Sequence, residues 1–371
     1  MKSIFFITIF TITVLMVFYV TLRGWQVLQP FTNLKTGYLV TNIFLFVVMF
    51  ASMALRNVFP DGVAKVVAFV GFSYMIVVIY LLLSFLATDI VRLFTFIFHL
   101  STEWISMFRF WAFSASLVLI TVAMLVGNYK FNNPAIVHLH LKSDKPKQDK
   151  KMRIVAVSDL HLGVSVDKSY LQKYVALINA QNPDIVLLAG DIADHSTAPI
   201  IRQNMAEEFR AIKSTHGVYA ISGNHEYFGE NPYELQEYLT KAGVTYLRDS
   251  AVMIDSSFYV VGRDDKINPK RKSLAQITSS LDTKKAMILL DHQPFHLNEA
   301  VENHYDLQIS GHTHNGQFFP GNLIVSRMYE VAHGYLKKGA THFYVSSGLG
   351  LWGPQYRIGT QSEVVVIDFE F

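Results

Sequence analysis

Residues 153–163 read RIVAVSDLHLG, an aliphatic run that ends in an aspartate and a histidine separated by one residue. A short run of β-branched and aliphatic residues at 154–157 predicts a buried strand. Because alternate side chains at the end of a strand point the same way, Asp159 and His161 can reach one ligand. This stretch therefore predicts a sheet strand with a metal-binding pair at its carboxyl end.

Four further apolar runs follow the same pattern. Together with residues 154–157 they make five runs. Helical segments at about 168–179 and 200–214 separate the first three of these five, which favours parallel strands joined by crossovers. Ligands of open α/β sheets bind where the strands end, so we expect all five endings to meet at one rim of one sheet. The four runs are residues 185–188, 218–221, 287–290 and 307–309, followed by Gly190 and Asp191, by Gly223, Asn224, His225 and Glu226, by Asp291 and His292, and by Gly311, His312 and His314.

The donor types at these endings predict the chemistry. Asp, Asn and His side chains are hard or borderline ligands, and seven or eight of them exceed what one tetrahedral ion needs. Two divalent ions that share a bridging carboxylate account for the surplus, and such a pair activates water and neutralises phosphoryl oxygens. The chain has no cysteine, so no thiol nucleophile is available. We therefore expect metal-dependent hydrolysis of a phosphate ester.

The ordered set Asp-x-His, Gly-Asp, Gly-Asn-His-Glu, His and Gly-His-x-His resembles the calcineurin-like metallophosphoesterase superfamily over residues 152–371. The stretch from Ser346 to Arg357 is similar to the ending of its membrane-anchored bacterial members. The resemblance implies a four-layer α-β-β-α sandwich. Its second sheet is expected to include residues 252–254, 258–261, 343–345 and 364–367.

The resemblance also implies a role for each motif residue. It implies a first metal ion on Asp159, His161 and His314, a second on Asn224, His292 and His312, and Asp191 as the shared and catalytically essential ligand. His225 is expected near the leaving group, as a proton donor or a stabiliser of charge, with Glu226 orienting it. Arg357 either binds a further anionic group of the substrate or is a surface residue, and His195 is expected to line the cleft. Manganese, iron, zinc and cobalt all suit this mixed donor set.

The amino-terminal third has a different composition. Only ten of the 61 charged side chains lie in residues 1–129. Runs of this length and hydrophobicity predict membrane spans, and they lack the charged face of a soluble helix. The third run either continues past Asp89 as a long helix or ends there. The four predicted spans are residues 4–22, 37–55, 66–87 and 105–126.

These features divide the chain into a helical membrane anchor (1–129), a basic linker (130–151) and an α/β phosphoesterase domain (152–371). Four spans place the amino terminus and the domain on the same side of an inner or plasma membrane. The lysines and arginines on that side favour the cytoplasm. These residues are Lys2, Arg56, Lys65, Lys130, Lys142, Lys145, Lys147, Lys150 and Lys151.

Several functions remain open at this point. A membrane anchor raises the local concentration of lipid-linked substrates, so we favour a phosphodiester or pyrophosphate bond in such a lipid. The resemblance also allows a UDP-2,3-diacylglucosamine pyrophosphatase. Cyclic nucleotides or a phosphoprotein, a transporter regulated by its soluble part, and a non-catalytic binding module are the alternatives. A net charge of +3 without a basic stripe argues against nucleic acid.

Overall fold

The computed structural model describes residues 2–54, 58–98, 101–145, 150–229 and 231–371. The chain divides into two compact units. The first contains residues 1–126 and 353–355, and the second contains residues 127–352 and 356–371. Arg56 and Lys147, two of the residues used for the membrane orientation, lie outside the described residues.

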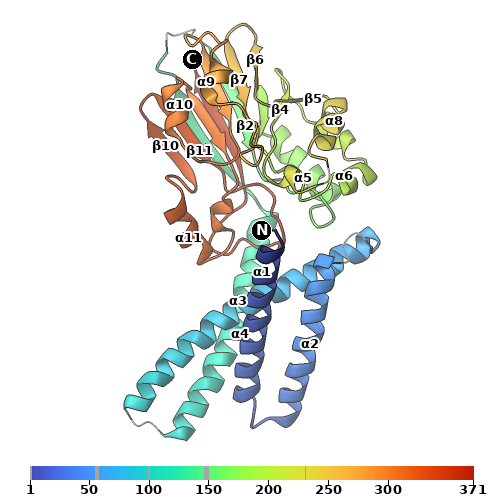
Figure 1. Cartoon of the computed structure of the whole chain (residues 1–371), viewed down its shortest axis with the longest axis vertical. Helices are drawn as coiled ribbons and strands as arrows, with labels where there is room; N and C mark the ends of the chain where they lie inside the picture. Colours follow the sequence, from blue (N-terminus) through green and yellow to red (C-terminus); the bar gives the residue numbers. More distant parts are fainter. Residues whose placement is uncertain (1, 55–57, 99–100, 146–149, 230) are drawn as a thin grey trace. The chain divides into compact units, whose positions relative to one another are not determined.

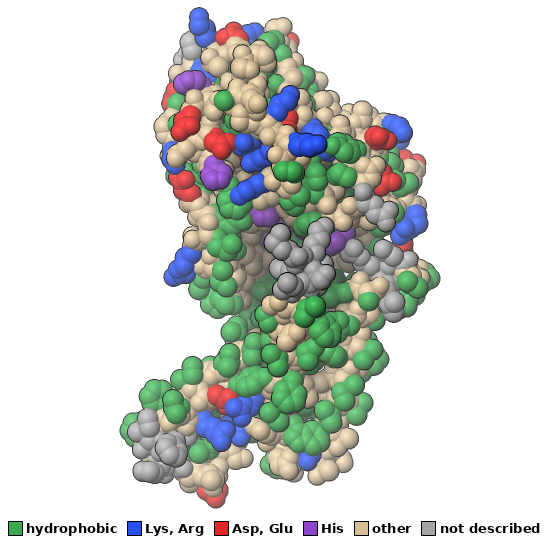
Figure 2. All heavy atoms as spheres, viewed as in Figure 1, with side chains coloured by type: hydrophobic (Ala, Val, Ile, Leu, Met, Phe, Trp, Pro, Cys, Tyr) green, Lys and Arg blue, Asp and Glu red, His purple; other side chains and the backbone are tan. Residues whose placement is uncertain are grey.

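The described residues of the amino-terminal part form four helices that are long and apolar enough to cross a membrane. Their outward side chains are largely Leu, Ile, Val and Phe, and Figure 2 shows these hydrophobic groups on the outer surface of the helices. Water does not favour such a surface, whereas lipid does. The chain is therefore a membrane protein. The helices are α1 Lys2–Val27, α2 Thr32–Ala54, α3 Asp61–Ile97 and α4 Thr102–Asn132.

Helix α3 continues past Asp89, so the longer of the two forms expected for the third run is the correct one. Its 37 residues extend about 56 Å. Asp89 is paired within the helical unit, because Arg23 Nη2 lies 2.5 Å and Tyr19 Oη 2.6 Å from its Oδ2. Ionisable groups among apolar helices are tolerated when they are paired in this way.

The second unit contains two six-stranded sheets within the described part of the chain (Figure 1). The first has the order β1-β12-β2-β3-β4-β5 and the second the order β10-β11-β9-β8-β7-β6. The strands of the first sheet are β1 Ala135–Lys142, β2 Lys151–Val157, β3 Ile185–Leu188, β4 Val218–Ala220, β5 Val244–Tyr246 and β12 Glu363–Glu370. Those of the second are β6 Ser250–Ile254, β7 Phe258–Gly262, β8 Ala286–Leu290, β9 Leu307–Ser310, β10 Gly334–Lys338 and β11 Thr341–Val345.

The helices of this unit are short. The helix expected at 168–179 is α5, which begins after Asp167, whose carboxylate accepts hydrogen bonds from two backbone N–H groups. The helix expected at 200–214 is instead split into α6 and α7, because Asn204 between them has a φ of 49°. The helices are α5 Lys168–Asn179, α6 Ala198–Arg202, α7 Ala206–Arg210, α8 Glu234–Lys241, α9 Leu274–Thr278, α10 Asn298–Glu302 and α11 Gly321–Met328, with 3-10 turns η1 His225–Tyr227 and η2 His314–Gly316.

Strand alternation builds the four predicted layers. In β2, Val155 and Val157 pack with residues of α5, α7 and α8, whereas Ile154 and Ala156 pack against the second sheet. In β8, Ile288 faces the first sheet and Met287 packs with residues of α9 and α10. Because neighbouring side chains of a strand point to opposite faces, this pattern gives the order helix, sheet, sheet, helix. The α-β-β-α sandwich is thus confirmed.

Two strand placements differ from our expectation. Residues 287–290 and 307–309 form β8 and β9 of the second sheet, so the five strand ends come from two sheets rather than one. Residues 364–367 lie in β12 of the first sheet, between β1 and β2, instead of the second sheet. Residues 287–290 and 364–367 are apolar throughout because both faces of their strands are buried, so their sequence does not show which sheet they join.

Part of the expected linker is also a strand. Residues 135–142 form β1, which pairs in parallel with β12 along its whole length. The sequence AIVHLHLK alternates apolar and polar side chains, with His138 and His140 less buried than their neighbours. Half-buried edge strands have this alternation. We assigned the segment to the linker because lysines are frequent around it.

Candidate active site

The loops after β2, β3, β4, β8 and β9 bring the predicted donors together in two groups. In the first, one ligand atom each from Asp159, His161 and His314 lies within 4.8 Å of the others. His314 Nε2 is 3.1 Å from His161 Nε2 and 3.4 Å from Asp159 Oδ1. All three side chains are buried. The Asp-x-His pair and the last histidine of the Gly-His-x-His motif therefore share one donor cluster.

The second group contains Asp191, His292 and His312, again within 4.8 Å of one another. His292 Nε2 is 3.2 Å from Asp191 Oδ2, and His312 Nδ1 is 2.6 Å from Asn224 Oδ1. The same Asp191 oxygen is 3.8 Å from His161 Nε2 of the first group. Asp191 thus stands between the two groups, and all seven predicted ligands lie in one cluster.

The chemistry of the cluster fits divalent cations. His292 Nδ1 is 2.8 Å from the carbonyl oxygen of Ala189, and since a carbonyl only accepts, Nδ1 carries the proton. Its buried Nε2 has no hydrogen-bond partner in the described structure yet faces the Asp191 carboxylate. A cation between this nitrogen and the carboxylate oxygen would satisfy both, and nitrogen and oxygen donors of this kind suit divalent transition metals.

Protonation within the cluster also fits metal binding. Burial lowers the pKa of His161 to about 3 and the pKa of His312 to about 4, so both rings are neutral. Neutral imidazole is the form that binds a metal. Burial alone would raise the pKa of Asp191, but His292 and its other histidine neighbours hold that pKa well below its usual value. Asp191 is therefore an ionised carboxylate, the form in which a carboxylate binds a metal ion.

The backbone of the cluster is strained. Left-handed φ angles are uncommon for residues with a side chain and gather at functional sites. Two glycines are also required, because a Cβ on Gly223 would lie 2.1 Å from Asp191 Oδ1 and one on Gly311 would lie 2.2 Å from Asp159 Oδ2. The ligands with a left-handed φ are Asp159 (55°), His161 (47°), Asp191 (51°), His312 (73°) and His314 (50°).

His225 lies beside the cluster, at the start of η1. Its backbone N–H donates to Asp191 Oδ1 at 2.9 Å, and its ring centroid is 4.5 Å from that of His161. Its Nδ1 contacts the backbone carbonyl of Asp194, and the Asp194 carboxylate is 3.7 Å from the same nitrogen. The loop after Asp191 therefore sets the orientation of this ring. We did not predict Asp194, because a lone acidic residue in a polar loop gives no signal in the sequence.

Glu226 has a different role from the one expected. Its carboxylate accepts hydrogen bonds from the backbone N–H groups of Gly223 (2.6 Å), Ala193 (2.9 Å) and Asp191 (3.1 Å). Burial and the nearby Asp191 raise the pKa of Glu226 to about 8. Glu226 thus fixes the two loops that carry Asp191 and Asn224, while Asp194 contacts the His225 ring.

His195 is partly exposed next to this ring. Its Nδ1 lies 3.2 Å from Asp194 Oδ1, and its ring centroid is 5.2 Å from that of His225. Phe228 packs on both rings, with centroids 5.9 Å and 4.9 Å away. His195 and Phe228 therefore flank the donor cluster on its His225 side.

Arg357 does not lie at the surface, so that expectation was wrong, and its guanidinium donates to protein groups. The side chain is fully buried. Its Nη1 donates to the carbonyl of His314 at 3.0 Å, its Nη2 to those of Gly348 and Gly350 at 2.9 Å, and its Nε to Ser362 Oγ at 3.2 Å. A guanidinium that joins four backbone and side-chain groups in this way ties the loop of His314 to the carboxyl-terminal loops.

Replacement of Arg357 by methionine is expected to destabilise the domain by about 3–5 kcal/mol, because buried carbonyls lose their donor. Thermal unfolding of the purified chain in detergent measures the effect. Arg210→Met, at an exposed position of α7, is the matched control and should unfold like wild type. Equal unfolding temperatures of the Arg357 variant and wild type would show that this network is not structural.

Several known proteins are similar to this chain in sequence. The family model for calcineurin-like phosphoesterases matches residues 152–316. A protein of Campylobacter jejuni described as an uncharacterized metallophosphoesterase is 33% identical over 267 residues, covering 70% of each chain. One from Helicobacter pylori is 34% identical over 228 residues, or 60% of each chain. A zebrafish (Danio rerio) transmembrane protein with a metallophosphoesterase domain is 30% identical over 253 residues, 63% of this chain and 57% of that one.

The fold, the donor cluster and these relatives define the chain as a metal-dependent phosphoesterase. It belongs to the calcineurin-like phosphoesterase family. The chain spans 60–70% of the length of the Helicobacter and Campylobacter relatives.

Proposed function

We propose that this protein hydrolyses a phosphodiester or pyrophosphate bond of a lipid-linked substrate with two divalent metal ions. The observation that supports it best is the position of Asp191, whose Oδ2 is 3.2 Å from His292 in one donor group and 3.8 Å from His161 in the other. A carboxylate between two donor groups is the arrangement of a dinuclear hydrolase. Manganese, iron, zinc or cobalt would suit the mixed oxygen and nitrogen donors.

The residues of the candidate site would have three roles. One ion would be held by Asp159, His161, His314 and Asp191, and the other by Asn224, His292, His312 and Asp191. When bound, the two ions would supply an activated water and neutralise charge on the phosphoryl oxygens. His225 would give a proton to the leaving oxygen, with Asp194 keeping the ring in place and Glu226 fixing the loops of Asp191 and Asn224.

The four apolar helices support a substrate in the membrane. Strand β1 begins at Ala135, three residues after α4 ends at Asn132, so only a short connection separates the last span from the domain. Such a tether raises the effective concentration of membrane-bound substrates at the site. Four crossings would place the domain on the side of the described lysines 65, 130, 142, 145, 150 and 151, which favours the cytoplasmic face of an inner or plasma membrane.

Hydrolysis in lipid nanodiscs tests this function. The purified chain should cleave bis-p-nitrophenyl phosphate, lose that activity after dialysis against a chelator, and regain it with Mn²⁺. It should cleave a lipid-linked diphosphate with kcat/KM at least roughly tenfold above that for the soluble diester. Activity that survives removal of metal would contradict the metal mechanism. A higher kcat/KM for a cyclic nucleotide or a phosphopeptide would contradict only the lipid substrate.

A further inference from the structure

Helix α11 is an exposed apolar segment of the phosphoesterase domain. None of its side chains is buried, and Leu323, Ile324 and Met328 are 46%, 61% and 64% exposed. These three residues, here called the α11 surface, span about 140° of the helix circumference, and Arg327 lies within the same arc. Scattered apolar residues are normal on a soluble surface, but a group of them marks an interaction site.

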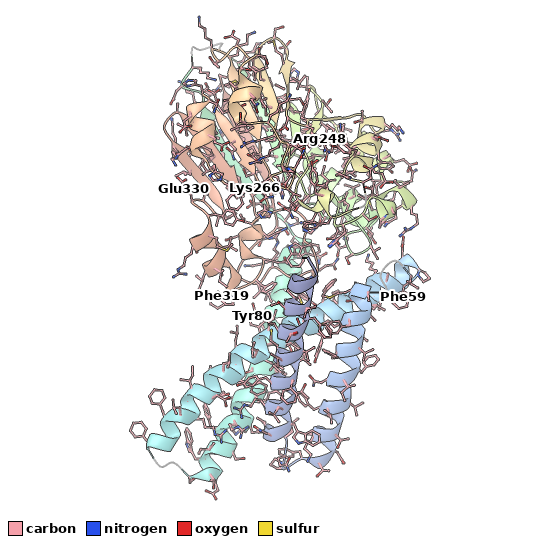
Figure 3. The ribbon with its side chains drawn as sticks, in the orientation of Figure 1. Phe59, Tyr80, Arg248, Lys266, Phe319 and Glu330 are labelled. Carbon is pink, nitrogen blue, oxygen red and sulfur yellow. The ribbon has the colours of Figure 1, made fainter. Side chains whose placement is uncertain are left out.

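Other exposed apolar residues flank the α11 surface. Phe319, labelled in Figure 3, precedes the helix and is exposed. Trp352 is also exposed, and its carbonyl accepts a hydrogen bond from Gln317 Nε2 at 3.2 Å. In the described remainder of the domain, the exposed large apolar side chains are separated by at least five residues in sequence. Along the described sequence of the domain, α11 is therefore the densest group of exposed large apolar side chains.

Backbone contacts connect the base of α11 to the end of helix α4. Phe319 N–H donates to the carbonyl of Ile358 at 2.7 Å. The neighbouring Arg357 N–H donates to the carbonyl of Gly127 at 2.9 Å, and a Cβ on Gly127 would lie 2.7 Å from Ile358 Cγ1. Residues 357–358 thus contact both the segment that precedes α11 and the last turns of α4.

The length of α4 places this contact near the membrane surface. The helix has 31 residues and so extends about 46 Å, more than the roughly 30 Å of a hydrocarbon core. If it enters the core near its first turn, the core ends several residues before Asn132. Gly127 then lies at the lipid–water interface, and the base of α11 lies there with it.

We propose that α11 lies in the interface of the membrane that the four helices cross, with the α11 surface among the lipid acyl chains. Arg327 lies between Leu323 and Ile324 on this face and donates to the Leu323 carbonyl at 2.9 Å, and its long side chain would extend to anionic headgroups. This inference rests on the proposed function and deepens it, because α11 connects the lipid surface to the site. In the sequence, α11 lies between His314 and Tyr329. The ring centroid of Tyr329 is 6.2 Å from that of His312.

The absence of cysteine makes a direct test possible. A single cysteine in the full chain, Ile324→Cys, carries a nitroxide label in vesicles of phosphatidylethanolamine and phosphatidylglycerol. Power-saturation spectroscopy compares access of oxygen, which enters lipid, with that of a nickel chelate, which stays in water. Leu119→Cys, exposed in α4, is the lipid control. Ser280→Cys, just after α9, is the water control, because Figure 1 places α9 and α11 at opposite ends of the domain.

The label at position 324 is expected to favour oxygen, as at Leu119, whereas the label at Ser280 favours the nickel chelate. A label at 324 that behaves like the one at 280 overturns the proposal. A label at position 324 that neither reagent reaches also overturns the proposal, because a second protein would shield the label in this way. This readout needs no turnover, so it remains valid if the proposed substrate is wrong.

A second variant tests whether the position of α11 in the membrane interface affects catalysis. Leu323→Asp combined with Ile324→Asp should reduce turnover of a lipid-linked diphosphate in vesicles about tenfold, because two side chains no longer enter lipid. Hydrolysis of bis-p-nitrophenyl phosphate should stay at the wild-type rate, since neither residue contacts the donor cluster. Unchanged turnover of the lipid overturns the proposal. If the wild-type protein hydrolyses neither substrate, that result would count against the proposed function alone.

Discussion

Replacement of Asp191 by alanine is expected to reduce phosphodiester hydrolysis by about a thousandfold or more. Its Oδ2 is close to His292 and His161, one in each donor group, and its Oδ1 accepts the backbone N–H of His225. No other carboxylate in the described structure is placed between the two groups. The variant therefore loses the charge that both ions need.

Two measurements on the same sample check this result. Elemental analysis should show lower metal content, and kcat/KM should fall in parallel. Asp191→Asn, which keeps the size and the acceptor for His225, should fold like wild type but lose most activity because the charge is gone. Asp282→Ala, at an exposed carboxylate, should retain full activity and metal. An alanine variant with normal metal content and normal turnover would show that Asp191 is not the shared ligand.

Replacement of His225 by alanine is expected to reduce the rate by roughly 10²–10⁴ while both ions stay bound. The ring lies within 4.8 Å of donors from His161 and Asp191, so a role as a further ligand is the competing explanation. Its Nδ1 is held by the Asp194 carbonyl, which makes it a less suitable metal donor. A proton donor in this position acts on the leaving oxygen.

The choice of leaving group separates these two roles. A proton donor matters most for a poor leaving group, so the loss in His225→Ala should be much larger for an alkyl diester than for a p-nitrophenyl diester. Asp194→Asn should show the same trend with a smaller loss, because Asp194 only positions the ring. Metal content that falls in His225→Ala as far as in Asp191→Ala would identify His225 as a ligand instead.

The candidate site was predictable because its signals are local. Each predicted ligand follows an apolar run by two to five residues, and a strand end brings such residues to one edge. The three hydrophobic clusters between the four layers also follow from strand alternation, as in β2 and β8. The family resemblance supplied the second sheet, which composition and periodicity do not show.

The sequence did not predict features that depend on distant partners. Strand β8 and residues 364–367 of β12 are apolar on both faces, so their pattern is compatible with either sheet. The donors of Arg357 are satisfied by carbonyls at 314, 348 and 350, which only the folded loops bring together. Glu226 likewise accepts from backbone groups of two other loops, and no side-chain pattern encodes backbone partners.

Anomalous X-ray diffraction from Mn²⁺-loaded crystals of the full chain, recorded at the manganese edge, tests the dinuclear site most directly. We expect two peaks, one bound by Asp159, His161 and His314, the other by Asn224, His292 and His312, with an Asp191 oxygen touching both. A single peak, or two peaks of which one lies away from Asp191, would contradict the account.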